Sequence, residues 1–317
     1  DKSISVSQSN NHKTRKWIFS TMLNHKFSNQ LSLRAGAMAN LAHYNFFILD
    51  KENITAPLLE RINVTGDAQT LQAYAQWQYK PLNNLTFNAG LHYLELTKNN
   101  TRSIEPRGSV KWDVNRKNSV AIGYGLHSQV QPLGVYFAKD PANPAPAPNA
   151  DLEFTKAHHF VLSYSRALGN SLRMKAEVYY QHLFNVPVSV DPEKTFSTLN
   201  VQNDFVTDAL VNDGKGRNYG VELTLEQSLN NNLYYILNGS VYESKYTALD
   251  GVERNTRFNG NYVFNGVAGK EFPLKGQRKV LGINLRVIYA GGFRNTPVNV
   301  EQSQQEGYPI YYEKQAF

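Results

Sequence analysis

The histidines have the widest chemical repertoire of any side chains in this sequence, and two of them have a reactive neighbour. His158 precedes His159, and His127 precedes Ser128. Successive side chains of an extended chain point to opposite faces, so neither pair can act on one metal ion or one substrate. The motifs G-x-S-x-G, H-E-x-x-H and the glycine-rich phosphate loop are absent, and the chain has no cysteine. The sequence therefore predicts no catalytic residue, no metal site and no cofactor, and we expect the protein not to be an enzyme.

A binding surface is a better hypothesis, on the extended segment that starts at Ser119. On one face, small residues give way to side chains that can hydrogen-bond: Ala121, Gly123 and Gly125, then His127, Gln129 and Gln131. Tyr136 and Phe137 follow in a long loop. We expect ligand contacts from His127, Gln129, Gln131, Tyr136 and Phe137. The alternative that these residues leave open is a water-facing wall with no role in ligand binding.

These side chains must be positioned by strands, because alternation of apolar and polar residues is the dominant pattern of the chain. In 85–97, for example, Leu85, Phe87 and Leu91 share one face, whereas Asn88 and His92 share the other. No helical period of similar length competes. The pattern predicts an all-β fold of about twelve antiparallel strands, near residues 15–24, 31–46, 70–80, 85–97, 104–113, 119–131, 157–168, 172–184, 216–227, 233–245, 258–271 and 278–292.

The connections between these strands fall into two classes that alternate along the chain. Tight turns are predicted at 81–84, 114–118, 168–171, 228–232 and 273–277. The other connections span 47–69, 98–103, 132–156, 185–215, 246–257 and 293–317, and all but 98–103 are longer than ordinary hairpin loops. In an up-and-down meander, this alternation places every tight turn at one end. That asymmetry is typical of an antiparallel transmembrane β-barrel of the outer membrane, and a soluble β-sandwich is the alternative.

The distribution of charge over the strand faces also favours the barrel. Lys or Arg on the lipid face would cost about 2–4 kcal/mol at the bilayer midplane, so charges must face the lumen. Met174 and Tyr180 lie on the apolar face of their strand and are expected to contact lipid. The lumen-facing polar residues are expected to be Arg173, Lys175, Glu177, Glu222 and Glu226. The pattern does not separate the faces of 234–237, where all four residues are apolar or aromatic.

Composition narrows the possible partners and the location. The formal net charge is +7, but Lys and Arg are spread along the 317 residues, which argues against a nucleic-acid partner. No apolar run approaches the 18 residues of a membrane helix. The first residues lack the pattern of a signal peptide, so we expect a processed protein or a fragment. Together with the strand pattern, these features predict a protein of the bacterial cell outer membrane, in contact with its lipid.

Three segments resemble the barrel of a TonB-dependent outer-membrane receptor. The most specific is SIEPRGSVKWDVNRKNSVAIGYGLHSQVQPLGVYF, residues 103–137, in which EPR opens a strand. AEVYYQHLFNVPV (176–188) and GRNYGVELTLE (216–226) resemble later strands of the same family. The resemblance follows the family's order over most of the chain.

The resemblance implies TonB-dependent, energy-coupled uptake of a scarce ligand: a siderophore, cobalamin or an oligosaccharide. It also implies a plug domain that contacts the TonB complex and the inner wall of a barrel of twenty-two strands. We therefore expect residues 1–317 to be a single β-barrel region without a plug domain and without the last strands, since Phe317, Gln315 and Glu313 do not form an amphipathic final strand. A passive porin or adhesin barrel is the alternative function, and a soluble all-β binding module is a further one.

Overall fold

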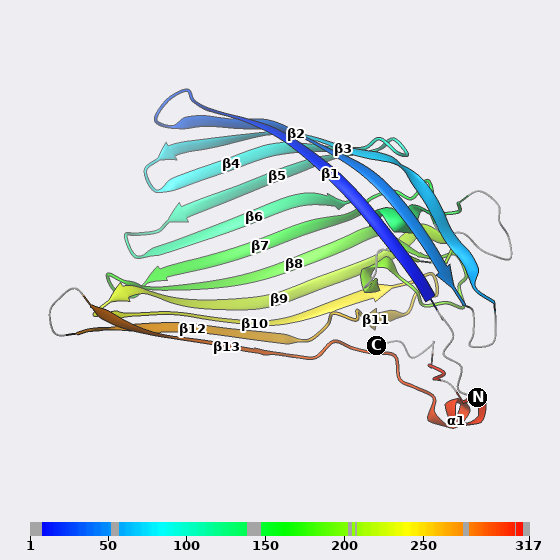
Figure 1. Cartoon of the computed structure of the whole chain (residues 1–317). Coiled ribbons are helices and arrows are strands. Elements are labelled where there is room, and N and C mark those ends of the chain that lie inside the picture. The colour runs from blue at the N-terminus through cyan, green and yellow to red at the C-terminus, as the bar shows by residue number, and fades with distance from the viewer. Residues whose placement is uncertain are drawn as a thin grey trace.

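The computed structural model describes residues 8–51, 57–137, 147–201, 205–206, 208–274, 279–307 and 309–312. Most of these residues form one antiparallel sheet that curves into an open trough (Figure 1). The strands are β1 (Gln8–Lys26), β2 (Leu31–Asp50), β3 (Leu59–Leu82), β4 (Leu85–Leu96), β5 (Thr101–Asp113), β6 (Asn118–Gln129), β7 (Thr155–Ala167), β8 (Leu172–Ser189), β9 (Leu210–Asn230), β10 (Leu233–Thr247), β11 (Glu253–Asn255), β12 (Tyr262–Pro273) and β13 (Val280–Ala290). Two short 3₁₀ helices, η1 (Leu133–Phe137) and η2 (Thr198–Asn200), and the helix α1 (Val300–Glu306) lie in connections or after the last strand. No described helix is long and apolar enough to cross a membrane.

The sheet is an up-and-down meander in which each strand pairs with its neighbours in the chain. The strand order runs from β1 to β10 and then to β12 and β13, while β11 pairs with the end of β10. The tight turns gather at one end of the trough, the turn end, and the other connections lie at the opposite end, the loop end, where the connection 97–100 between β4 and β5 is also short (Figure 1). The prediction of an antiparallel meander with separated turns and loops is therefore confirmed. Residues 275–277 of the predicted turn 273–277, and residues 313–317, lie outside the described residues.

Several strands are longer than the sequence pattern predicted. The expected loop 47–69 is largely strand, because β2 reaches Asp50 and β3 starts at Leu59. Likewise, β8 reaches Ser189 and β9 starts at Leu210 inside the expected loop 185–215. The boundaries were wrong because apolar or buried residues follow one another at these ends, as in residues 46–49 of β2 and 186–189 of β8. These ends therefore lack the alternation on which the strand assignment relied.

The hairpin β9–β10 shows how a tight turn is encoded. Only Asn231 and Asn232 separate the two strands, and both have positive φ, 51° and 61°. Two-residue hairpins favour the turn type that needs positive φ at both central residues, because its twist matches that of the strands. Asparagine tolerates this conformation better than most residues, so the pair directs the chain back on itself.

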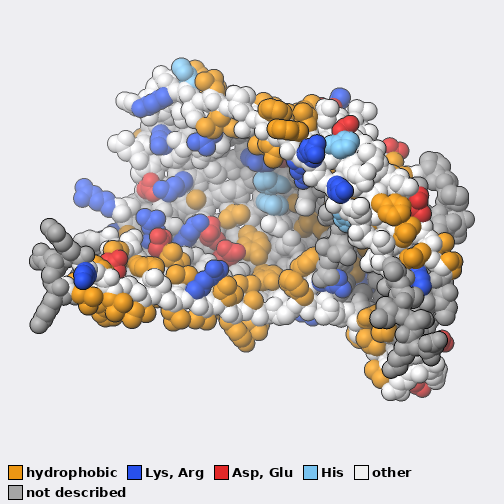
Figure 2. All heavy atoms as spheres, viewed as in Figure 1, with side chains coloured by type: hydrophobic (Ala, Val, Ile, Leu, Met, Phe, Trp, Pro, Cys, Tyr) orange, Lys and Arg blue, Asp and Glu red, His pale blue; other side chains and the backbone are white. Residues whose placement is uncertain are grey.

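The two faces of the sheet differ in the way that a membrane wall requires. Ile122, Leu162, Val178 and Val221 are cross-strand neighbours on the convex face, and each is at least half exposed. The concave face carries the polar set. Figure 2 looks into the hollow, where acidic and basic side chains gather toward the turn end and histidines lie closer to the loop end. The convex face is therefore the lipid face.

Buried residues concentrate at the loop end, on the concave face. One hydrophobic cluster joins Leu94 and Leu96 of β4 to Val135, Tyr136 and Phe154. A second joins aromatic and aliphatic residues of β2 and β3 to Phe137. Because η1 contributes to both clusters, the connection after β6 folds inward onto the wall instead of extending into solvent.

Candidate functional site

The concave face of β2–β7 contains a hollow of about 590 Å³. Gly90, Gly123 and Gly125 lie in its lining and carry no side chain that could fill it. The polar groups around them come from six strands: Arg34, Tyr74, His92, Arg107, His127 and His159. Alternation explains this arrangement, since every second residue of each strand points to the concave face. The hollow can therefore hold a ligand through hydrogen bonds and positive charge.

Glu105 forms the centre of a polar network beside this hollow. Its carboxylate is buried, with 1% of the residue exposed. Oε2 accepts a hydrogen bond from Nη2 of Arg107 at 2.7 Å and lies 2.9 Å from Nδ1 of His92, while Oε1 accepts from the backbone N–H of Ser128 at 3.1 Å. A buried carboxylate needs such partners, because charge without them is costly to desolvate. The network fixes Arg107 at the edge of the hollow.

No role was predicted for Glu105 from the sequence, where it appeared only within the segment that resembles the receptor family. An available signal was its spacing, because an acid two residues before Arg107 on a strand points to the same face. Charges of opposite sign on one face of a strand can pair directly, as these two do.

His127 and His159 lie together on the wall, from neighbouring strands. Their ring centroids are 4.4 Å apart at 33°. Gly125 makes this possible, because a Cβ at that position would lie only 2.5 Å from Nε2 of His127. His158, the sequence neighbour of His159, instead lies 3.0 Å from the Tyr124 hydroxyl on the convex face. The expectation that adjacent histidines point apart thus agrees with the geometry.

The other predicted ligand contacts are placed differently from His127. Gln129 is exposed at the end of β6, and Gln131 is buried, with its amide donating to Oγ1 of Thr155 at 2.8 Å. Tyr136 is fully buried in the first cluster, where burial raises the pKa of its phenol to about 12. Phe137 is buried in the second cluster, beneath the Lys98 ammonium at 4.4 Å from the ring. In this structure Gln131, Tyr136 and Phe137 therefore hold the loop to the wall.

The predicted lumen-facing residues lie on the concave face toward the turn end. Arg173, Lys175 and Glu226 line a second hollow, of about 520 Å³. Glu177 and Glu222 face each other across β8 and β9, and Nζ of Lys175 lies 2.7 Å from Oε2 of Glu177. Met174 and Tyr180 are on the opposite, convex face, at alternate positions of β8.

Buried asparagines at the loop end were missed by the sequence reading. Nδ2 of Asn149 donates to the carbonyl oxygens of Val135 and Asp208, and its Oδ1 accepts from the N–H of Leu210. This one side chain ties the β6–β7 connection to the β8–β9 connection. Asparagine is usual in exposed turns, so composition alone gives no sign of such a role.

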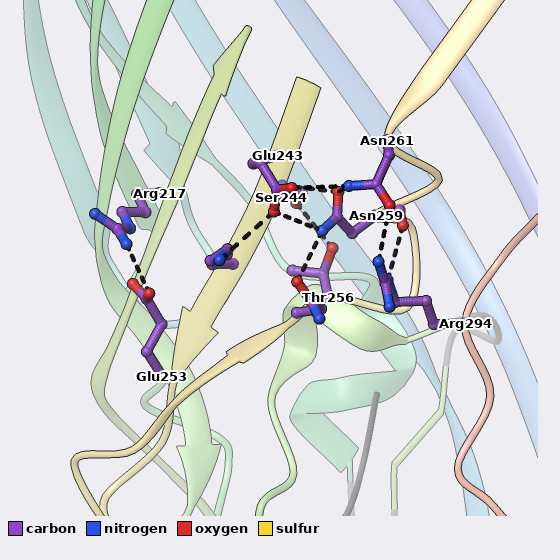
Figure 3. Close-up of polar contacts among 10 residues, drawn as sticks. Arg217, Glu243, Ser244, Glu253, Thr256, Asn259, Asn261 and Arg294 are labelled. Atoms are coloured by element: carbon purple, nitrogen blue, oxygen red, sulfur yellow. Dashed lines mark hydrogen bonds and ion pairs between the residues drawn. The ribbon is translucent and has the colours of Figure 1, made fainter. Parts of the chain in front are cut away.

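A second asparagine network fixes the connection between β10 and β12 (Figure 3). Nδ2 of Asn259 donates to Glu243 Oε2 at 3.0 Å, and Nδ2 of Asn261 donates to Oε1 of the same carboxylate at 2.9 Å. Arg294, beyond β13, donates to the Asn259 carbonyl and to Oδ1 of Asn261. The network joins three segments that are separate in sequence, so the loop end is internally bonded.

Histidine and acidic side chains of the concave face are of the types that bind metal ions. Among the described residues, no group of three or more acidic or histidine side chains could hold a metal ion. Hydrogen-bonding and cationic side chains around a bare hollow suit reversible recognition of a polar ligand or of another polypeptide segment.

Comparison with known proteins shows which family this β-sheet belongs to. Residues 2–309 match the family model described as TonB dependent receptor-like, beta-barrel. The chain belongs to the TonB-dependent receptor-like β-barrel family. This family consists of outer-membrane transporters and not of enzymes, so the predicted location in the bacterial outer membrane and the predicted absence of enzyme activity are confirmed. No curated protein matches the chain at a significant level of sequence similarity.

Solved receptor structures share the fold. The ferric yersiniabactin uptake receptor FyuA from Yersinia pestis matches with a TM-score of 0.66 at 16% identity, over 90% of this chain and 44% of that one. The FrpB iron transporter from Neisseria meningitidis matches with a TM-score of 0.59 at 11% identity, over 91% and 44%. The RagAB peptide transporter matches with a TM-score of 0.61 at 10% identity, over 91% and 42%. The chain thus spans less than half the length of these receptors.

Proposed function

We propose that this chain is the wall of a receptor that takes up a scarce ligand by TonB-dependent, energy-coupled transport. The ligand classes are those of a siderophore, cobalamin or an oligosaccharide, and a similar structure that transports peptides adds a fourth class to test. The whole chain, residues 1–317, acts as a single barrel region, and a plug domain relays the action of the TonB complex. The barrel supplies the path and the selectivity and performs no covalent chemistry.

The observation that carries this proposal is the hollow around Arg107, His127 and His159. It opens on the concave face, which becomes the lumen in a closed barrel. Its side chains are fixed before a ligand arrives, by the Glu105 network and by the contact between the two imidazoles. Pre-organised polar groups lose little conformational entropy on binding, which suits capture of a ligand at low concentration.

The neighbouring residues have distinct proposed roles. Gln129 is exposed at the end of β6 and is a further residue that we propose to touch a ligand or the plug. Gln131, Tyr136 and Phe137 hold the inward-folded connection after β6 against the sheet, because all three are buried. The charged set at the turn end, including Arg173 and Glu226, lines the part of the lumen where a plug would need polar partners.

An uptake assay in whole cells tests the proposal. The full receptor is expressed with and without TonB, and cells are offered iron-loaded siderophores, labelled cobalamin, a labelled maltodextrin and a labelled oligopeptide. We expect one probe to accumulate only when TonB is present. Replacing His127 and His159 by Ala should reduce that uptake roughly 25-fold, by removing two hydrogen-bonding groups worth about 1 kcal/mol each.

His158→Ala is the matched control, since it removes a neighbouring imidazole from the convex face. It should leave uptake unchanged. Accumulation that does not need TonB would indicate a passive pore, and failure of all four probes would exclude the proposed ligand classes. An equal loss in the control variant would show that the hollow is not the site.

A further inference from the structure

The convex face carries a basic patch on β7–β10, next to its apolar band. Phe160, Tyr180 and Tyr219 are cross-strand neighbours at the loop-end edge of that band. Each next outward-facing position toward the loop end is basic: His158 on β7, His182 on β8 and Arg217 on β9, with Lys245 opposite Arg217 on β10. One step further lie Lys156 and Lys215. The basic patch is therefore Lys156, His158, His182, Lys215, Arg217 and Lys245.

Aromatic contacts hold part of this patch in place. Nδ1 of His158 lies 3.0 Å from the Tyr124 hydroxyl. The ring of Phe184 stacks on His158 with centroids 5.1 Å apart at 20°, and lies 6.3 Å from His182 at 18°. The Arg217 guanidinium lies over Tyr219, 5.7 Å from the ring centroid. The patch is thus partly ordered without any bound partner.

The patch has more positive than negative charge. Nη2 of Arg217 lies 2.7 Å from Oε2 of Glu253 (Figure 3), and Nζ of Lys245 lies 3.6 Å from Oε2 of Glu243. Among the described residues no ion pair involves Lys156 or Lys215, so two cationic side chains of the patch are available to an anion.

The position of the patch identifies what kind of anion it meets. Aromatic belts of outer-membrane barrels lie at the membrane–water interfaces, with their rings at the level of the lipid headgroups. Side chains one and two steps toward the loops are therefore at the level of headgroup phosphates on the outer surface. Lys and Arg bind phosphate through charge-assisted hydrogen bonds.

We propose that this basic patch binds the phosphate groups of lipid in the outer leaflet. The patch would hold a shell of phosphorylated lipid against β7–β10 and fix the height of this part of the wall in the bilayer. The proposal needs only the outer-membrane location established above, and it holds whichever ligand the receptor transports.

The test measures binding of bisphosphorylated lipid A to the full receptor in detergent micelles, against a dephosphorylated lipid A with the same acyl chains. A Lys or Arg near the surface contributes about 1 kcal/mol of attraction to anionic lipid, which is roughly fivefold in affinity. The variant K156Q/K215Q should therefore bind the phosphorylated lipid roughly 25-fold more weakly than wild type. It should also lose most of the difference between the two lipids.

The matched control is K111Q/K175Q, which removes two Lys from the concave face. It should bind lipid A as wild type does. An unchanged affinity in K156Q/K215Q, or an equal loss in the control, would overturn the proposal. Displacement of lipid A by millimolar inorganic phosphate would show a site for free phosphate instead of lipid. Circular dichroism checks the fold of each variant, and the single variant K215Q, with an expected fivefold loss, replaces a double variant that does not fold.

Discussion

The loop end and the turn end of this sheet are stabilised by different kinds of interaction. At the turn end, hairpins such as β9–β10 close with two residues, and exposed side chains dominate. At the loop end, long connections fold back onto the concave face and bury aromatic residues and asparagines. A turn is specified by its own few residues, whereas the loop end depends on contacts between segments that are far apart in sequence. Three substitutions test this difference, in decreasing order of expected effect.

The largest effect is expected from Phe154→Ala. Phe154 is fully buried in the first cluster, so the change leaves a cavity and should reduce the free energy of unfolding by about 3–5 kcal/mol. Urea unfolding of the protein in micelles measures it. Leu168→Ala is the control, because Leu168 is 47% exposed in the turn between β7 and β8 and should change stability by less than about 0.5 kcal/mol. Similar losses at both positions would remove the contrast between the two ends.

A pH effect of intermediate size is expected from Tyr136. Its pKa rises from 10.0 to about 12 because burial disfavours the phenolate. The folded chain therefore holds this proton more tightly than the unfolded chain. Its contribution to stability is fully present below pH 10 and is lost as the pH rises through about 12. The difference of two pKa units corresponds to about 2.7 kcal/mol.

Tyr136→Phe isolates this contribution. Between pH 9 and pH 12.5, the wild type should lose about 2–3 kcal/mol more than the variant in urea unfolding, because only the wild type can ionise at this position. If the free energy of unfolding depends on pH in the same way for the two proteins, the Tyr136 hydroxyl is accessible to water.

A smaller effect is expected from Asn149→Ala. The change removes hydrogen-bond partners from three backbone groups, those of Val135, Asp208 and Leu210, at a cost of about 1–3 kcal/mol. Amide hydrogen exchange should increase at Leu210 and nearby in the β8–β9 connection. Asn115→Ala at the turn end is the control. Its Oδ1 accepts from the N–H groups of Lys117 and Asn118, so any increase in exchange should stay within that turn. An increase at the loop end in the control would contradict local encoding of turns.

The difference between locally specified turns and long-range contacts at the loop end explains which parts of the fold could be predicted from the sequence. Alternation and turn residues were enough to predict twelve strands of the meander and the segregation of its faces, because both follow from neighbouring residues. At 234–237 apolar residues occupy both faces, and only cross-strand pairing resolves them: Leu237 lies opposite Leu225 on the convex face, and Ile236 lies opposite Glu226 on the concave face. The short strand β11 was not predicted, because three residues carry too little pattern.

The candidate site was predictable only in part. The strand pattern placed His127 on the wall of the hollow, but it could not show that His159 lies beside it, since that contact depends on the register of β6 and β7. Tyr136 and Phe137 were expected to meet a ligand or the plug because they follow the polar face of β6 in a long loop. They are buried because the loop folds inward, which is a tertiary event that no local pattern encodes.

The length of the strands has a consequence for how such a receptor can change over generations. β3 has 24 residues, which at about 3.3 Å per residue is roughly 80 Å of strand, whereas a membrane crossing needs about 9–11 residues. More than half of β3 therefore stands outside the bilayer as a rigid collar between the lipid and the loops. Insertions or exchanges in the loops alter the top of this collar and leave the lipid-facing segment and its pairing undisturbed. A loop can therefore change in length or sequence without rebuilding the part of the wall that lies in the membrane.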